Sequence, residues 1–238
     1  MKIDVCFSPA LYPAYHNPEN IVVVVDVFRA TTTMTTAFHN GVKNIRPVAS
    51  VEEAKAYKEK GWLVGAERHV KRCDFADFGN SPFDYTPEKI KGKEIVFTTT
   101  NGTKAITLAK DAFRVIIGAF INLQAVAGYC LARQRDVTVL ASGWEDQINI
   151  EDTLFGGALV DTLVNSGKYQ TGSDAAIIAR GMWTAHKHDL MGYMEQTDHL
   201  SRLKANHLED SIPYCLALDI APVVPELHIE KEILLLQI

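Results

Sequence analysis

The sequence lacks any apolar run near the roughly 20 residues needed to span a bilayer, so no membrane segment is expected. Its first residues, MKIDVCFSP, contain no long hydrophobic segment of the kind found in a secretory signal. We therefore expect a cytoplasmic protein that does not bind membranes. Cysteine is scarce and never paired as CxxC, which disfavours a zinc ribbon and a dithiol redox motif. The four cysteines are Cys6, Cys73, Cys130 and Cys215.

Clustered positive charge is also missing, because the net charge is -5 and the isoelectric point is near 5.9. A nucleic-acid surface needs clustered cations, whereas the densest basic segment here, Arg68 with Lys71 and Arg72, suits only a small anion. Neither GxxxxGKS/T nor GxGxxG follows any predicted strand, so nucleotide binding has no motif support. The composition is otherwise that of a globular protein, and we expect one domain spanning residues 1–238.

The stretch from Ile21 to Gly41 is the segment around which the chain is organised. Five consecutive β-branched residues, 21–25, predict a strand buried on both faces, as in a parallel sheet covered by helices. Asp26 follows at the strand end, and then Arg29 and the run ATTT lead into a helix that Gly41 can end. Because ligands bind at the carboxyl ends of strands in open α/β sheets, this junction is a candidate site. The alternative is that Asp26 and the threonines only cap the helix.

Strand and helix patterns alternate along the chain, which predicts an α/β fold of three layers, α/β/α, with a largely parallel or mixed sheet. Further strands are expected at 3–7, 44–48, 62–65, 94–98, 114–118 and 137–141, and helices at 50–60, 101–110, 123–133, 151–165, 174–188 and 196–207. Ser50 and Glu53 have the spacing of a capping box. The proline-punctuated tail, 212–238, suits edge strands better than central ones. Segments 21–60 and 94–133 resemble one another, as an internal duplication of βαβα units would produce.

Polar side chains collect at the carboxyl ends of the predicted strands. If the strands are parallel neighbours, these groups face one crevice. Carboxylates suit Mg²⁺, arginines can clamp an anion, and helix N-termini add backbone N–H groups. Together these parts predict a Mg²⁺-assisted phosphatase acting on a small anionic phosphate ester. The strand-end groups are Asp26, Arg29, Glu67, Arg68, Thr98 to Thr103, Glu145, Glu151 and Asp152.

Each of these parts also has a purely structural interpretation. Glu151 and Asp152 would complement the dipole of the helix they begin. The threonines at 98–100 would only pack, and Glu67 with Arg68 would form a surface ion pair. The segment 79–82, Gly-Asn-Ser-Pro, is a turn signature within the long loop 69–87, and a loop of that length is usually functional or a linker.

Two other classes of site have little support. Haloacid dehalogenase-like phosphatases carry a second Asp two residues after the first, but Phe28 occupies that position. Four histidines in the last third of the chain match no zinc spacing, and we expect them at the surface or at helix ends. These are His186, His188, His199 and His207.

Four segments occur in the order VVVVDVFRATTT, GAERHVKRCDFADFGNSP, FTTTNGTKAI and INIEDTLFGGAL, and through them the chain resembles the 2-phosphosulfolactate phosphatase (ComB-like) family. The resemblance implies a Mg²⁺-dependent phosphomonoester hydrolase of coenzyme M biosynthesis, which converts 2-phospho-3-sulfolactate to 3-sulfolactate and phosphate on an α/β fold peculiar to the family. It also implies the site residues, which are Asp26, Arg29, Ala30, Thr31, Glu67, Arg68, Asn80, Ser81, Thr99, Thr100, Asn101, Gly102, Thr103, Glu151 and Asp152.

Within this set we expect Asp26 and Glu67 to act as metal ligands or acid/base groups, with Glu151 or Asp152 completing the metal shell. Arg29 and Arg68 would hold anionic oxygens, and the turn 100–103 would cradle the phosphate. Two alternatives are a non-catalytic protein that binds a small anion and a phosphatase for another phosphorylated hydroxy acid on the same scaffold. The sequence is also compatible with a homo-oligomer.

Overall fold

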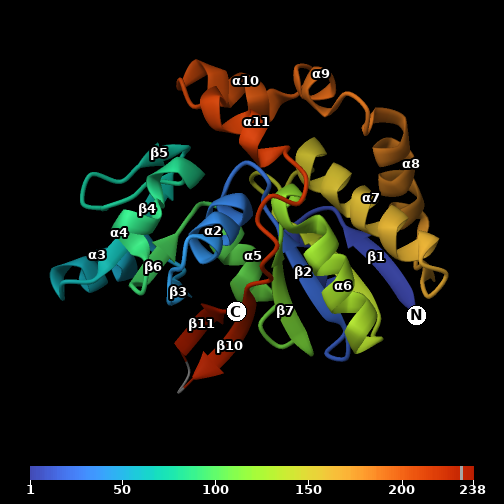
Figure 1. Ribbon diagram of the computed structural model, residues 1–238, viewed down its shortest axis with the longest axis horizontal. Helices are drawn as coiled ribbons and strands as arrows, with labels where there is room; N and C mark the ends of the chain where they lie inside the picture. Colours follow the sequence, from blue (N-terminus) through green and yellow to red (C-terminus); the bar gives the residue numbers. More distant parts are fainter. Residues whose placement is uncertain (231–232) are drawn as a thin grey trace.

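The computed structural model describes residues 1–230 and 233–238. These residues form an α/β fold in which helices cover both faces of a mixed β-sheet (Figure 1). This architecture is consistent with the predicted three-layer α/β/α fold. The strands are β1 (Lys2–Cys6), β2 (Ile21–Val25), β3 (Asn44–Pro47), β4 (Leu63–Arg68), β5 (Lys71–Arg72), β6 (Glu94–Thr98), β7 (Arg114–Gly118), β8 (Val137–Ala141), β9 (Gln170–Thr171), β10 (Glu226–Glu230) and β11 (Ile233–Gln237).

The helices connect these strands and cover the sheet. The α-helices are α1 (Tyr12–Tyr15), α2 (Ala30–His39), α3 (Val51–Glu59), α4 (Pro87–Ile90), α5 (Gly102–Leu108), α6 (Leu123–Arg133), α7 (Ile150–Asn165), α8 (Asp174–His186), α9 (Leu190–Met194), α10 (Asp198–Ala205) and α11 (Ile212–Cys215). Short 3-10 helices, η1 to η4, cover Pro9–Leu11, Pro82–Asp84, Phe120–Asn122 and Glu209–Ser211. No helix within residues 1–230 and 233–238 has the length and apolarity needed to cross a membrane.

The sheet contains two parallel groups of strands. Its order is β5-β4-β6-β3-β11-β10-β7-β2-β8-β1-β9. Strands β4, β6 and β3 are parallel to one another, and so are β7, β2, β8, β1 and β9. The antiparallel hairpin β10–β11 lies between the groups and meets them through the pairs Glu226–Ile116 and Leu236–Ile45. Strands β2 and β4 are therefore not neighbours, contrary to the simplest form of the strand-end prediction.

Strand β2 is buried on both faces, as its five β-branched residues predict. Ile21, Val23 and Val25 pack in one core cluster with residues of α6, α7 and α8. Val22 and Val24 pack in a second cluster with residues of α2 and α5. Figure 1 shows α6 and α7 beside this strand group. The alternation follows from the two-residue period of a strand. Because both faces of β2 are packed in this way, the position of Asp26, directly after the strand, is fixed.

The second core cluster joins the two strand groups. Ile95 and Phe97 of β6 share it with β2, α2 and α5, whereas Val96 points to the other face and packs with Ala54 of α3. Helix α5 begins directly after β6, and a methyl group placed on Gly102 would lie 3.0 Å from Asp26 Oδ2. The ends of β2 and β6 therefore meet although the strands are far apart in the sheet order.

Most of the predicted elements are confirmed, several with the same bounds: the strands at 21–25, 94–98, 114–118 and 137–141 and the helix at 123–133. Gly41 has φ of +88° just after α2, and Ser50 Oγ accepts the Glu53 N–H at 3.1 Å at the start of α3. The loop 69–87 is more ordered than expected, because it contains β5 and a bridge between Gly65 and Phe78. The βαβα resemblance remains a prediction.

The position predicted for the C-terminal tail is wrong. The hairpin β10–β11 is interior to the sheet and not at its edge. Pro222 and Pro225 both precede β10, so neither removes an N–H from the ladder, and Leu227 and Leu236 are buried in the second core cluster. Lys231 and Glu232, which belong to the predicted tail, lie outside the described residues.

Candidate active site

A small cavity opens at the carboxyl ends of β2 and β4, beneath α10 at the top of Figure 1. We call it the front cavity. Its walls come from six separate parts of the chain, and five of the predicted site residues, Asp26, Arg29, Glu67, Asn80 and Asn101, line it. The other lining residues are Phe28, Val70, Gly143, Trp144, His199 and Leu203.

Asp26 follows β2 and is held by the first turn of α2. Its Oδ1 accepts the Ala30 N–H at 3.3 Å, and its own N–H donates to Thr31 Oγ1 at 2.9 Å. Burial raises the pKa of Asp26 to about 6. The charge of His199 and the Ala30 N–H lower this pKa, whereas the charges of Glu67 and Glu151 raise it. Asp26 can therefore change its protonation state near neutral pH.

Arg29 is a buried cation without a protein counter-ion. Its exposed fraction is 3%, and no residue among 1–230 and 233–238 forms a hydrogen bond or ion pair with its guanidinium. Burial lowers its pKa, while the charges of Cys215, Glu67 and Asp210 act in the opposite direction. An uncompensated charge in such a position is costly unless a ligand pairs with it. Arg29 therefore brings a positive charge without a protein partner to the wall of the front cavity.

Glu67 reaches the front cavity from the end of β4. Its Oε1 accepts the Val70 N–H at 2.6 Å and the Thr100 hydroxyl at 3.2 Å. Arg68, the next residue, does not line the cavity. Its guanidinium donates to the Glu67 backbone oxygen at 2.6 Å and to Thr98 Oγ1 at 2.9 Å. Arg68 thus ties the ends of β4 and β6 together and holds Glu67 in place.

The remaining predicted binding residues divide into lining and supporting groups. Asn80 Oδ1 is buried and has no hydrogen-bond partner among the described residues, so it is free to bind a ligand in the cavity. Thr103 Oγ1 bonds to the backbone of Thr99 at the N-terminus of α5 and stiffens that turn. Ala30, Thr31, Thr99, Thr100, Gly102 and Thr103 surround the lining residues without lining the cavity, and Ser81 is also outside it.

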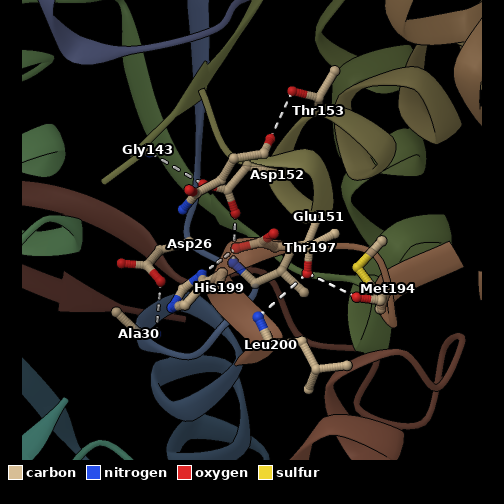
Figure 2. A network of polar contacts seen from close by, with 12 residues as sticks. Asp26, Ala30, Gly143, Glu151, Asp152, Thr153, Met194, Thr197, His199 and Leu200 are labelled. Carbon is tan, nitrogen blue, oxygen red and sulfur yellow. Dashed lines mark hydrogen bonds and ion pairs between the residues drawn. The ribbon is translucent and has the colours of Figure 1, made fainter. Parts of the chain in front are cut away.

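His199 lies in the first turn of α10, which agrees with the expected place at a helix end, but its side chain is buried and contacts other site residues. Its Nδ1 lies 2.5 Å from Glu151 Oε1, and Figure 2 shows the ring between the side chains of Asp26 and Glu151. When the Glu151 carboxylate is ionised it can only accept, and Nδ1 is then the donor of this hydrogen bond. The sequence holds a signal for this position: His199 and Leu203 are four residues apart on the buried face of an amphipathic helix.

Asp152 is next to Glu151 in the sequence but faces a different partner. Its Oδ1 accepts the Val27 N–H at 2.8 Å, and its Oδ2 accepts the Gly143 N–H at 3.2 Å (Figure 2). Burial raises the pKa of Asp152 well above its ordinary value, and the charges of Glu151 and Asp26 add to this. Asp152 therefore joins two backbone segments that line the front cavity, those after Asp26 and before Trp144.

The donor set of the front cavity fits a hard divalent cation. No group of three or more His, Cys, Asp or Glu side chains arranged to hold a metal ion occurs in the part of the chain that the structure describes. Mg²⁺ needs no such cage, because it usually binds one or two carboxylates and keeps several waters. Asp26 and Glu67 are the carboxylates of the cavity, and both oxygens of Asp152 already accept N–H groups.

An α/β sheet that places carboxylates, amides and an unpaired arginine around one cavity at its strand ends has the groups that an enzyme acting on an anionic ester requires. The chain belongs to the 2-phosphosulfolactate phosphatase family, since the family model described as 2-phosphosulpholactate phosphatase matches residues 6–230. This confirms the resemblance seen in the sequence motifs and makes the protein a phosphatase by family.

Relatives support the same assignment over nearly the full chain. A protein of Clostridium novyi (strain NT) named probable 2-phosphosulfolactate phosphatase is 36% identical over 97% of this chain and 99% of its own length. A protein of the same name from Caldanaerobacter subterraneus subsp. tengcongensis is 35% identical over 88% of each chain. One from Microcystis aeruginosa is 33% identical over 98% of this chain and 97% of its own length.

Proposed function

We propose that this protein hydrolyses 2-phospho-3-sulfolactate to 3-sulfolactate and inorganic phosphate, with Mg²⁺ as cofactor, as a cytoplasmic step of coenzyme M biosynthesis. The names of its relatives support the substrate, and the front cavity supports the reaction class. The observation that carries the proposal is Arg29, a buried guanidinium without a protein partner, in the same cavity as Asp26 and Glu67.

The residues of the front cavity have separable tasks in this proposal. Arg29 pairs with oxygens of the phosphoryl group, and the side-chain NH₂ group of Asn101 donates to the same group. Asn80 Oδ1 can only accept, so it would bind a donor group of the substrate or a water. Asp26 and Glu67 would hold Mg²⁺, which neutralises phosphoryl charge and activates a water when it is bound. His199 is oriented by Glu151 and leaves its second ring nitrogen, Nε2, free to exchange a proton at the ester.

The direct test is phosphate release from a panel of esters. We expect Mg²⁺-dependent release from 2-phospho-3-sulfolactate, with slower release from 2-phospholactate and phosphoglycolate, and loss of activity in EDTA. The alternative, a non-catalytic anion-binding protein, predicts that these esters raise the melting temperature without any turnover. A preference for phosphoglycolate or phospholactate would favour a phosphatase for another hydroxy acid.

Substitution of Asp26 tests the site itself. In Asp26→Asn we expect kcat to fall by about 100-fold or more, as for the loss of an acid/base or metal-binding carboxylate. The matched control is Asp146→Asn, since Asp146 pairs with Lys104 at the exposed rim of the molecule. Near wild-type hydrolysis by a folded Asp26→Asn variant would remove Asp26 from the mechanism.

A further inference from the structure

A second cavity adjoins the front cavity and shares Trp144 and His199 with it. We call it the rear cavity. It has a volume of about 180 Å³, compared with about 20 Å³ for the front cavity. A space of about 20 Å³ holds roughly one water-sized group, so a substrate with three anionic groups extends beyond it. Its other lining residues are Gln147, Ile148, Asn149, Ile150, Glu151, Gln196, Thr197, Asp198 and Arg202.

Arg202 is the cation of the rear cavity. Its guanidinium carbon lies 4.6 Å from the centre of the Trp144 ring. Its Nε is buried and has no hydrogen-bond partner, and no ion pair of Arg202 occurs among residues 1–230 and 233–238. Stacking on an indole fixes the plane of a guanidinium and leaves its N–H edge available for an oxyanion. The molecule therefore holds a second unpaired arginine, in addition to Arg29, next to the front cavity.

The backbone around Trp144 holds this platform in a defined position. Trp144 and Gln147 exchange two backbone hydrogen bonds, of 3.1 and 2.9 Å, in an isolated bridge. Gly143 has φ of +60°, and a methyl group there would lie 2.2 Å from the Gln147 carbonyl oxygen, so only glycine fits. Asp152 also binds the Gly143 N–H. The Trp144–Arg202 stack is thus built on a rigid turn.

The other charges of the rear cavity do not neutralise Arg202. Glu151 directs Oε1 to His199, its Oε2 is buried without a hydrogen-bond partner among the described residues, and Asp198 is exposed at the start of α10. Gln147, Asn149 and Gln196 supply side-chain amides that can donate to the same oxyanion. The lining therefore contains one stacked cation, amide donors and two carboxylates, of which Glu151 pairs with His199 and neither pairs with Arg202 among the described residues. The unpaired guanidinium and the amides are the groups that can bind a small, fully ionised anion.

We propose that Arg202, stacked on Trp144, binds the sulfonate of the substrate while Arg29 binds its phosphate. This assignment rests on the proposed function. In 2-phospho-3-sulfolactate the phosphate and the carboxylate are attached through the same carbon, and the sulfonate lies one carbon further away. The sulfonate is thus the group that reaches from the front cavity past Trp144 into the rear cavity. Its three oxygens match the N–H edge of the guanidinium and the neighbouring amides.

Three esters distinguish binding of the sulfonate from binding of the carboxylate. They are 2-phospho-3-sulfolactate, which has both groups, 2-phospholactate, which lacks the sulfonate, and 2-phosphooxyethanesulfonate, which lacks the carboxylate. In Arg202→Gln we expect kcat/KM to fall about 10- to 100-fold for both sulfonates, the usual loss for a charged hydrogen bond, and less than about 3-fold for 2-phospholactate. Arg202→Lys should recover part of the loss. Lys204→Gln, on the same helix and paired with exposed Glu195, is the control and should behave as wild type.

Equal losses on all three esters, or no loss on any, would overturn the sulfonate assignment. A loss on 2-phospho-3-sulfolactate and 2-phospholactate, with none on 2-phosphooxyethanesulfonate, would show instead that Arg202 binds the carboxylate. Calorimetry with 3-sulfolactate and lactate, on wild type and Arg202→Gln, is independent of turnover. We expect 3-sulfolactate to bind wild type more tightly, with the difference lost in the variant. If wild type hydrolyses none of the esters, the proposed function fails, and the calorimetry still decides whether Arg202 binds a sulfonate.

Discussion

Replacement of Asp152 distinguishes a metal ligand from a structural carboxylate. The side chain is 1% exposed, and its two oxygens accept the N–H groups of Val27 and Gly143, which are themselves buried. These N–H groups belong to the segments that present Asp26 and Trp144 to the front cavity. We predict that Asp152 acts through the backbone, so its loss should lower stability and activity together.

The size of the effect follows from the number of N–H groups left without an acceptor. A buried donor without a partner costs about 1–3 kcal/mol. Asp152→Ala leaves two N–H groups without an acceptor, so it should lower the free energy of unfolding by about 2–6 kcal/mol. Asp152→Asn retains one oxygen and turns an NH₂ group toward the other N–H. We expect it to lose about 1–3 kcal/mol, which places it between wild type and Asp152→Ala.

The pH dependence has a defined sign. Burial raises the pKa of folded Asp152, so between its unfolded and folded pKa values the folded state binds more protons than the unfolded state. The stability that wild type gains from this group is therefore full at low pH and declines as the pH rises through the folded pKa. Asparagine does not titrate, so the difference in unfolding free energy between wild type and Asp152→Asn should be larger at pH 5 than at pH 8.

Urea unfolding followed by circular dichroism gives the free energies, and phosphate release against Mg²⁺ concentration gives the metal requirement. We expect Asp152→Asn to show a lower kcat at an unchanged Mg²⁺ midpoint. The reasoning would be refuted by a variant of wild-type stability that needs much more Mg²⁺. That result would make Asp152 a metal ligand, the role that the sequence analysis offered to either Glu151 or Asp152.

Further predictions address the other elements of the site. Ser50→Ala should lower the free energy of unfolding by about 0.5–2 kcal/mol without changing phosphate release, because it removes only a helix cap remote from the cavity. Gly102→Ala should lower stability by about 1–3 kcal/mol and reduce kcat, since its methyl group would lie 3.0 Å from Asp26 Oδ2; calorimetry and phosphate release test this. Carbon-13 NMR titration of the metal-free protein should give Asp26 a pKa of about 6. This pKa should fall in Glu67→Gln, which removes a like charge, and rise in His199→Gln, which removes an opposite one; unchanged values would show that neither charge acts on Asp26.

The strands could be predicted because their signal is local. A continuous run such as Ile21 to Val25 is buried on both faces wherever it lies in the sheet, so its bounds follow from its own composition. The position of a strand in the sheet depends on distant partners. The prolines before β10 predicted that the hairpin β10–β11 lies at an edge of the sheet. The hairpin instead lies between two strand groups, where Leu227 and Leu236 are buried in the second core cluster. No local pattern in the tail specifies those partners.

The residues of the site divide in the same way. Asp26 and Asn101 follow strands and Glu67 lies near the end of β4, and these strand ends meet at one cavity, so a rule about strand ends was sufficient to find them. His199 comes from a helix that begins nearly 60 residues after the last large strand of its group, and only the folding of α10 across the cavity brings it there. Its helical spacing shows that it is buried, but the sequence does not show which carboxylate it meets.

Adjacent acids illustrate why residue type alone does not assign a role. Glu151 and Asp152 are a pair of carboxylates in the sequence, but neighbouring side chains on a helix point about 100° apart. Glu151 consequently meets His199 and Asp152 meets the backbone after Asp26. Their common chemistry suggested one metal shell, whereas the helix directs them to different partners.

The two arginines show the same principle for cations. Arg29 follows β2 and Arg68 ends β4, and both suggested an anion clamp. Arg68 already donates to a backbone oxygen and to Thr98 Oγ1, so these two hydrogen bonds hold its guanidinium against the protein and fewer of its five N–H groups face a ligand. Arg29 is buried without such partners, and a phosphate would relieve its desolvation instead of competing with the protein. Affinity for the anion should therefore depend far more on Arg29 than on Arg68, and the difference arises from their hydrogen-bond partners, which the sequence does not reveal.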